Sequence, residues 1–132
     1  MSEARLRRVL LVEPHFVMRN TVANVARQLR LGEIHEATHH DAALRMLKSD
    51  VYDALLCDLG DALGGVALVQ QVRDGGTLCD RDLPIAIMAG SLDADTVAVC
   101  KRLQVQRIMI KPFKVKTAVE VLSSLSGVPL PA

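Results

Sequence analysis

The chain has 132 residues, of which half are apolar and 23% carry a charged side chain. This length allows one domain with a single buried core, and the composition is typical of a folded globular protein rather than a disordered one. The formal net charge of +1 excludes a global electrostatic field that would draw nucleic acid or an anionic membrane to the whole surface.

Five short segments have the pattern of β-strands. Residues 9–12 form a continuous apolar run with a valine at each end, which favours a strand buried on both faces of a parallel sheet. Residues 33–37 are more polar and suit the edge of a sheet. Three further apolar runs follow at residues 54–57, 85–88 and 108–110. Together they predict a five-stranded sheet.

Each run is followed by apolar residues at helical spacing, which predicts five helices. Their inward residues are Met18, Val22, Val25 and Leu29 in the first, Ala43, Leu44 and Leu47 in the second, Val66, Val69 and Val72 in the third, Val97, Cys100 and Leu103 in the fourth, and Val115, Val119 and Leu122 in the fifth. The predicted end residues are Gly32 after the first helix, Asp41 before the second, Gly75 and Gly76 after the third, Ser91 or Asp93 before the fourth, and Gly127 after the fifth.

Strands that alternate with helices predict an α/β fold, a doubly wound five-stranded parallel sheet with helices on both faces. We expect residues 1–132 to form one domain, with a core at about 8–125 and a loose tail at 126–132. Ligands of such sheets bind beyond the carboxyl ends of the strands, where the strand order reverses.

Three of those strand ends are followed by, or end in, a residue with a charged side chain. The first strand is followed by Glu13, the third by Asp58, the fourth by Gly90 after Ala89, and the fifth by Lys111. Two carboxylates and one ammonium that converge can hold a divalent cation and balance the charge of a phosphoryl group.

Four segments at these strands resemble those of the response-regulator receiver domains of two-component signalling. They are LLVEPHFVMRNTV, YDALLCDLGDALGG, LPIAIMAGS and RIMIKPFK. The resemblance runs from about residue 8 to residue 122 and is specific through the order of the segments, with an aspartate and the KPF triplet each at a strand end. It implies the flavodoxin-like receiver fold of the chemotaxis regulators.

The resemblance also implies roles for single residues. Asp58 matches the aspartate that accepts a phosphoryl group, and Lys111 matches the lysine that pairs with the phosphoryl oxygen. Pro112 matches a proline that the family typically places after a cis peptide bond. Glu13, Asp58 and Gly60 match the positions that hold Mg²⁺, directly or through water.

The match to the family is incomplete. Pro14 stands where the family has a second acidic metal ligand, so we expect Mg²⁺ binding to be weakened. Ala89 stands at the position of the switch serine or threonine, and Ile108 at that of the aromatic switch residue. Asp61, in a loop that keeps only Gly65 of the family pattern, is a candidate replacement for the lost ligand.

The leading interpretation is a stand-alone, atypical response regulator that relays a signal by protein contacts. The resemblance implies a histidine kinase or phosphotransfer protein as phosphodonor, with Asp58 as acceptor. It also implies a target protein, or a second copy in a homodimer, at the face of the fourth helix, fifth strand and fifth helix. That face carries several basic residues, Lys101, Arg102, Arg107, Lys111, Lys114 and Lys116. The alternative is a pseudo-receiver that binds partners without phosphorylation.

Two other classes fit the sequence less well. A phosphatase-like enzyme with Asp58 as nucleophile would have a second aspartate two residues later, where this chain has Gly60, so we expect no enzyme activity. Recognition of a nucleotide or cyclic dinucleotide would depend on Arg102 and Arg107, because no glycine-rich loop opens a helix. Nucleic acid is a poor candidate, since the chain has only three aromatic residues and no recognition-helix motif.

The remaining signals concern location and metals. The three cysteines are scattered and odd in number, which favours a reducing cytoplasm, and no apolar segment predicts a secretory signal or a membrane span. Cys57 should point away from Asp58 and pack as an inert thiol. His35 and His39 are four residues apart, but a predicted strand-to-helix break between them argues against a metal site.

Overall fold

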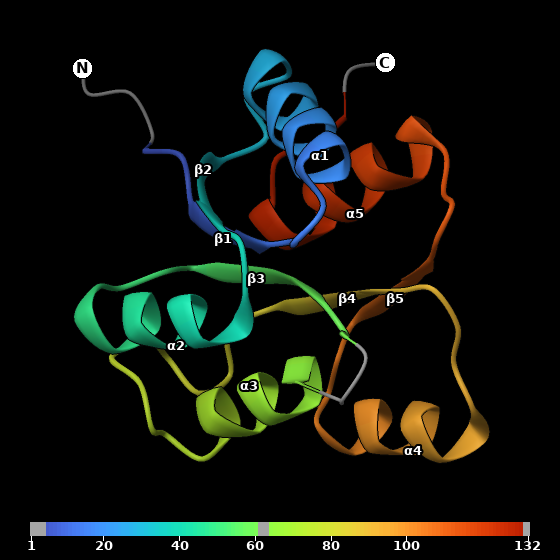
Figure 1. Cartoon of the computed structure of the whole chain (residues 1–132). Helices are drawn as coiled ribbons and strands as arrows, with labels where there is room; N and C mark the ends of the chain where they lie inside the picture. The colour runs from blue at the N-terminus through green and yellow to red at the C-terminus, as the bar shows by residue number, and fades with distance from the viewer. Residues whose placement is uncertain (1–4, 61–63, 131–132) are drawn as a thin grey trace.

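The computed structural model describes residues 5–60 and 64–130, in which strands and helices alternate along the chain (Figure 1). The strands are β1 (Arg8–Val12), β2 (Glu33–Ala37), β3 (Ala54–Asp58), β4 (Ile85–Ala89) and β5 (Arg107–Ile110). The helices are α1 (Phe16–Gln28), α2 (His40–Ser49), α3 (Gly64–Arg73), α4 (Ala94–Arg102) and α5 (Val115–Ser126). The predicted fold class is confirmed.

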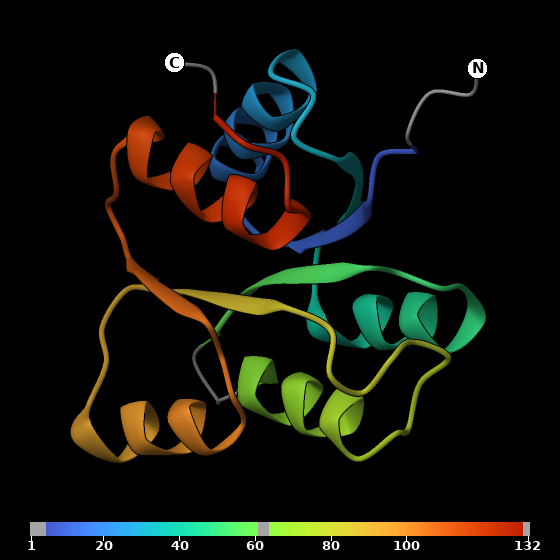
Figure 2. The same ribbon diagram turned by 180° about the vertical axis from the view of Figure 1, so that it is seen from behind.

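The five strands pair in parallel, in the order β2-β1-β3-β4-β5. Helices α1 and α5 cover one face of the sheet, and α2, α3 and α4 cover the other (Figures 1 and 2). The strand order reverses between β1 and β3, which lie side by side although α1, β2 and α2 separate them in sequence. The loops after these two strands therefore open on the same edge of the sheet, as predicted.

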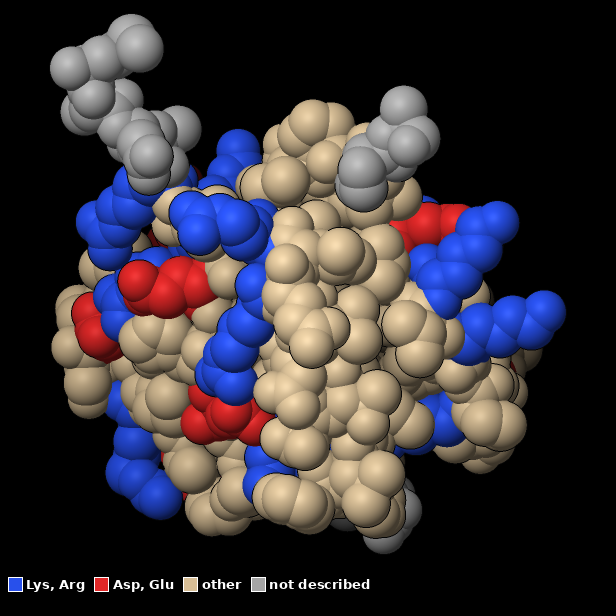
Figure 3. Space-filling model, turned by 90° about the horizontal axis from the view of Figure 1, so that it is seen from above, with Lys and Arg blue, Asp and Glu red and all other residues tan. Residues whose placement is uncertain are grey.

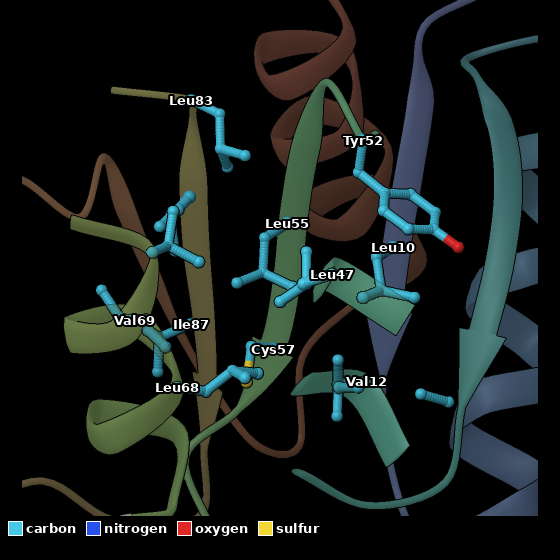
Figure 4. Packing of buried hydrophobic residues seen from close by; sticks show 14 of the residues in the cluster. Leu10, Val12, Leu47, Tyr52, Leu55, Cys57, Leu68, Val69, Leu83 and Ile87 are labelled. Carbon is cyan, nitrogen blue, oxygen red and sulfur yellow. The ribbon is translucent and has the colours of Figure 1, made fainter. Parts of the chain in front are cut away.

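The core forms two layers, one on each side of the sheet. All residues of β3 and β4 are buried, and alternate residues enter opposite layers. Leu55 and Ile87 pack against α2 and α3, where Leu47 and Val69 meet them (Figure 4). Each fully buried leucine or isoleucine stabilises the fold by about 2 kcal/mol relative to an exposed one. This packing holds β1, β3 and β4 rigidly beneath the loops that carry the site.

Several predicted helix details are wrong. Leu29 and Val115 are 43% and 52% exposed, because they lie at the helix ends, beyond the sheet. The first helix does not end at Gly32, since Arg30 takes the left-handed conformation at φ 53°. Asp41 does not cap α2, because the side chain of His39 accepts the N–H of the residue three positions later.

The end of the chain is more ordered than the predicted tail. Ser126 is buried and belongs to α5, and Gly127 ends this helix with a left-handed φ of 73°. Val128 then packs against the core layer under α1 and α5. Residue 126, predicted as the first residue of the tail, therefore belongs to the last helix. Within residues 5–60 and 64–130, no helix is long and apolar enough to cross a membrane.

Candidate functional site

Three charged side chains meet at the carboxyl edge of the sheet. Lys111, directly after β5, places its Nζ 2.5 Å from Glu13 Oε1 and 2.8 Å from Asp58 Oδ1. Glu13 follows β1 and Asp58 ends β3, so three separate strands supply the group. The convergence expected from the strand ends is therefore present, with one ammonium between two carboxylates.

Glu13 is the most constrained member of this group. Its side chain is fully buried, and Oε2 accepts the backbone N–H of His15 at 3.0 Å while lying 3.1 Å from His15 Nδ1. Apart from the ion pair with Lys111, Oε1 has no hydrogen-bond partner among the described residues. Arg19 also donates to the backbone carbonyl of Glu13 at 2.9 Å. Such a buried carboxylate depends on Lys111 for charge compensation.

The two carboxylates keep Lys111 charged. Burial alone would lower the pKa of Lys111, but its hydrogen bonds and attraction to Asp58 and Glu13 outweigh burial, and the pKa is raised. A raised pKa in the folded state means that this ion pair stabilises the fold at neutral pH and is lost only as the pH rises through the lysine range. Lys111 therefore belongs to this site rather than to the basic face counted from the sequence.

Asp58 and Lys111 border an open cavity of about 490 Å³, whereas the fully buried Glu13 is not among its lining residues. Its walls include Asp58, Gly60, Gly90 and Lys111, four of the residues expected there. Its other lining residues come from the loops after β1, β3 and β4 and from the start of α4, namely His15, Leu59, Ser91, Leu92, Asp93 and Thr96. A phosphoryl group on Asp58 would face this cavity.

His15 and Thr96 line the cavity but were not predicted to belong to this site. His15 follows Glu13 by two residues and has a side chain 77% exposed, so its place in the loop after β1 was a usable signal. Thr96 lies one turn into α4 and is 8% exposed, and its position depends on how α4 packs, which the sequence alone does not define.

The structure describes three of the residues at which this chain differs from the family pattern. Ala89 is buried at the end of β4 and offers no hydroxyl to the cavity, and Ile108 is a half-buried aliphatic residue on β5. Pro14 is exposed and brings no carboxylate. Pro112 follows a cis peptide bond, as the resemblance implies. Asp61 lies outside the described residues.

Close backbone contacts explain why position 65, after β3, is a glycine. A Cβ on Gly65 would lie 2.6 Å from the backbone oxygen of Asp58 and 2.8 Å from the Cα of Leu59. No side chain fits there without moving this backbone, which would displace Asp58. Gly65 also donates its N–H to the carbonyl of Leu59 at 2.8 Å, which closes the turn into α3.

The donors present suit a hard cation that keeps part of its water shell. Asp58 and Gly60 border the cavity, while the Glu13 carboxylate already contacts Lys111 and His15. Within the described ranges, no group of three or more His, Cys, Asp or Glu side chains is arranged around one point. Mg²⁺ typically binds through one or two carboxylates plus water and phosphate oxygens, and these residues fit that mode weakly.

Cys57, next to Asp58, is fully buried in the layer under α2 and α3. Burial, with smaller contributions from the charges of Asp58 and Glu13, raises the pKa of its thiol. It is thus a neutral thiol at physiological pH, as its predicted inward orientation implied.

Comparison with known proteins finds receiver domains that are similar to this chain. Residues 9–123 match the Response regulator receiver domain family. The chain is 25% identical over 119 residues to Chemotaxis protein CheY-3 of Vibrio cholerae, a match that covers 89% of this chain and 90% of that protein.

Two solved structures illustrate the likeness in fold. The non-phosphorylated HemR receiver domain from Leptospira biflexa is 20% identical, with a TM-score of 0.80 over 96% of this chain and 98% of that one. The receiver domain of sensor histidine kinase PA1611 from Pseudomonas aeruginosa is 22% identical, with a TM-score of 0.75 over 94% and 99%. That domain was crystallised with a magnesium ion in its active-site cleft.

Proposed function

This chain belongs to the response regulator receiver family of two-component signalling, and we propose that it accepts a phosphoryl group on Asp58 and passes the signal on by binding another protein. The observation that carries the proposal is the position of Lys111, with Nζ 2.8 Å from Asp58 Oδ1 at the edge of an open cavity. There the ammonium can balance the charge that a phosphoryl group adds.

The transfer itself requires little from the protein. An oxygen of Asp58 attacks the phosphorus of the donor, the bond between phosphorus and the donor atom breaks, and the donor keeps that electron pair. Lys111 then neutralises negative charge on the transferred group. Bound Mg²⁺ would supply further charge neutralisation, with Asp58 and Gly60 as its protein ligands and Glu13 acting through water. Because Pro14 removes one carboxylate, we propose that this chain binds Mg²⁺ weakly.

We propose that the signal is read by a partner protein rather than through a large internal switch. Ala89 has no hydroxyl to follow the phosphoryl group, and Ile108 has no polar tip to exchange between buried and exposed positions. A change confined to the cavity and its loops is then what a partner would detect. Receiver domains are generally not enzymes, and we propose that this one has no catalytic turnover of its own.

The surface beside the cavity suits a protein partner. Figure 3 shows a band without Lys, Arg, Asp or Glu over α1 and α5, with charged groups on both sides. Phe16 and Val17, the first two residues of α1, are 66% and 75% exposed and directly follow the cavity residue His15. Exposed apolar residues in such a group mark protein contacts. We propose that the phosphodonor, a histidine kinase or phosphotransfer protein, touches this band as it reaches Asp58.

A different surface is available for the target. Ile110 on the edge strand β5 is 49% exposed, and Arg107 on the same strand is exposed as well. Helices α4 and α5 and the residue before α5 add exposed basic side chains, namely Lys101, Arg102, Lys116 and Lys114. We propose that this face binds an acidic surface of the target, or a second copy of the chain.

Phosphorylation can be tested without knowing the natural donor. Incubation with acetyl phosphate and Mg²⁺ should raise the intact mass by one phosphoryl group, and Asp58→Asn should abolish this increase. A matched control, Asp53→Asn, changes the aspartate that directly precedes the same strand and should be labelled like the parent. Absence of labelling in the folded parent, beside a labelled receiver of known competence, would contradict the proposal and favour a phosphorylation-independent pseudo-receiver.

A further inference from the structure

The loop that carries Asp58 rests on a histidine from another element. His40, the first residue of α2, places Nε2 2.6 Å from the backbone oxygen of Asp58. A carbonyl oxygen can only accept, so Nε2 carries the hydrogen and donates it. The thiol of Cys57 contacts the same oxygen at 3.2 Å. The main chain of the proposed phosphoacceptor is thus held from the α2 side of the sheet.

The same imidazole fills the space under two glycines. A Cβ on Gly60 would lie 2.7 Å from His40 Cε1, and a Cβ on Gly64 would overlap His40 Nδ1. Gly60 also has a φ of +77°, in the region that side chains rarely adopt. The imidazole ring therefore occupies its place only because both positions are glycines, since a side chain at either position would displace the His40 ring.

We propose that His40 is a positioning residue, which holds the backbone from Asp58 to Gly60 in the place where these two residues line the cavity. This inference rests on the proposed function, because it concerns the two residues proposed to hold the phosphoryl group and Mg²⁺. Removal of a residue that orients a metal ligand or a reactive side chain typically lowers the affinity or the rate by about 10- to 100-fold.

The test compares three substitutions. His40→Leu keeps an apolar side chain in the space but removes the donor, and His40→Gln restores a donor at a similar reach. His39→Ser is the matched control, because serine can still cap α2 and the neighbouring His39 side chain contacts the N–H of Ala42 instead of this loop. Each variant is assayed for hydrogen exchange of the Leu59 and Gly65 amides by NMR and for the rate of labelling by acetyl phosphate.

We expect His40→Leu to raise the exchange rates of both amides about tenfold and to lower the rate of labelling about tenfold. In His40→Gln, all of these rates should stay within about threefold of the parent. In His39→Ser they should be unchanged. Unchanged exchange and labelling in His40→Leu would overturn the inference. Equal losses in the leucine and glutamine variants would also overturn it, since they would indicate filling of space without a role for the donor.

The two proposals fail separately in this experiment. If the parent takes no phosphate, the proposed function is contradicted, and the exchange rates of Leu59 and Gly65 still decide whether His40 positions the loop. If the parent is labelled and His40→Leu behaves like it in both assays, only the inference about His40 is overturned.

Discussion

Replacement of Lys111 by methionine is expected to lower the free energy of unfolding by about 3 kcal/mol at neutral pH. The side chain of Glu13 is fully buried and that of Asp58 is 10% exposed, and Lys111 is the cation that pairs with both. Methionine preserves most of the aliphatic volume, so the loss would come from charge. Urea unfolding followed by circular dichroism measures the difference.

Two further variants separate this charge effect from general damage. Lys116→Met changes an exposed lysine of α5 and should shift stability by at most about 0.5 kcal/mol. Glu13→Gln added to Lys111→Met should recover part of the loss, because it removes one of the two uncompensated charges. If the double variant were as unstable as the sum of the single ones, the ion pair would not be what stabilises this edge of the sheet.

Replacement of Pro14 by aspartate is expected to tighten Mg²⁺ binding by about 10- to 100-fold. Pro14 is exposed and directly follows Glu13, so a carboxylate at this position would add a ligand without disturbing the core. Affinity for a hard cation rises with the number of anionic oxygen ligands. Isothermal titration calorimetry with MgCl₂ compares the variant with the parent.

Pro14→Asn is the control for this substitution. It removes the proline ring and offers a neutral oxygen, so it separates the carboxylate from the release of the backbone. We expect its Mg²⁺ affinity to stay within about threefold of the parent. Equal affinity of the aspartate variant and the parent would mean that the missing carboxylate does not limit metal binding here.

The central strands β3 and β4 were predictable because they are buried on both faces of the sheet. The runs at residues 54–57 and 85–88 are continuous and apolar, which parallel central strands require, and the structure extends each by only one residue. The convergence of Asp58 with Lys111 followed from topology, since the carboxyl ends of parallel strands meet at one edge. These features depend on patterns that a single sequence displays.

Helix ends and loop contacts were less predictable. Leu29 keeps the 3.6-residue period of α1 but extends past the sheet, so its periodicity gave a false prediction of burial. Arg30 takes the left-handed position expected for Gly32, because Leu31 is already buried in the core and the chain must turn before it. The contact of His40 with Asp58 joins residues 18 positions apart through packing of α2, which no local pattern encodes.

The most direct test of the phosphoacceptor pocket is ¹⁹F NMR of the protein with fluoroberyllate and Mg²⁺. The beryllium of this anion binds a carboxylate oxygen in the way that a phosphoryl group does. The parent should show bound fluorine signals that disappear in Asp58→Asn and weaken in Lys111→Met, and Pro14→Asp should lower the Mg²⁺ concentration needed to produce them. A folded parent with no bound signal at saturating Mg²⁺, or an undiminished signal in Asp58→Asn, would contradict the assignment of Asp58 as phosphoacceptor.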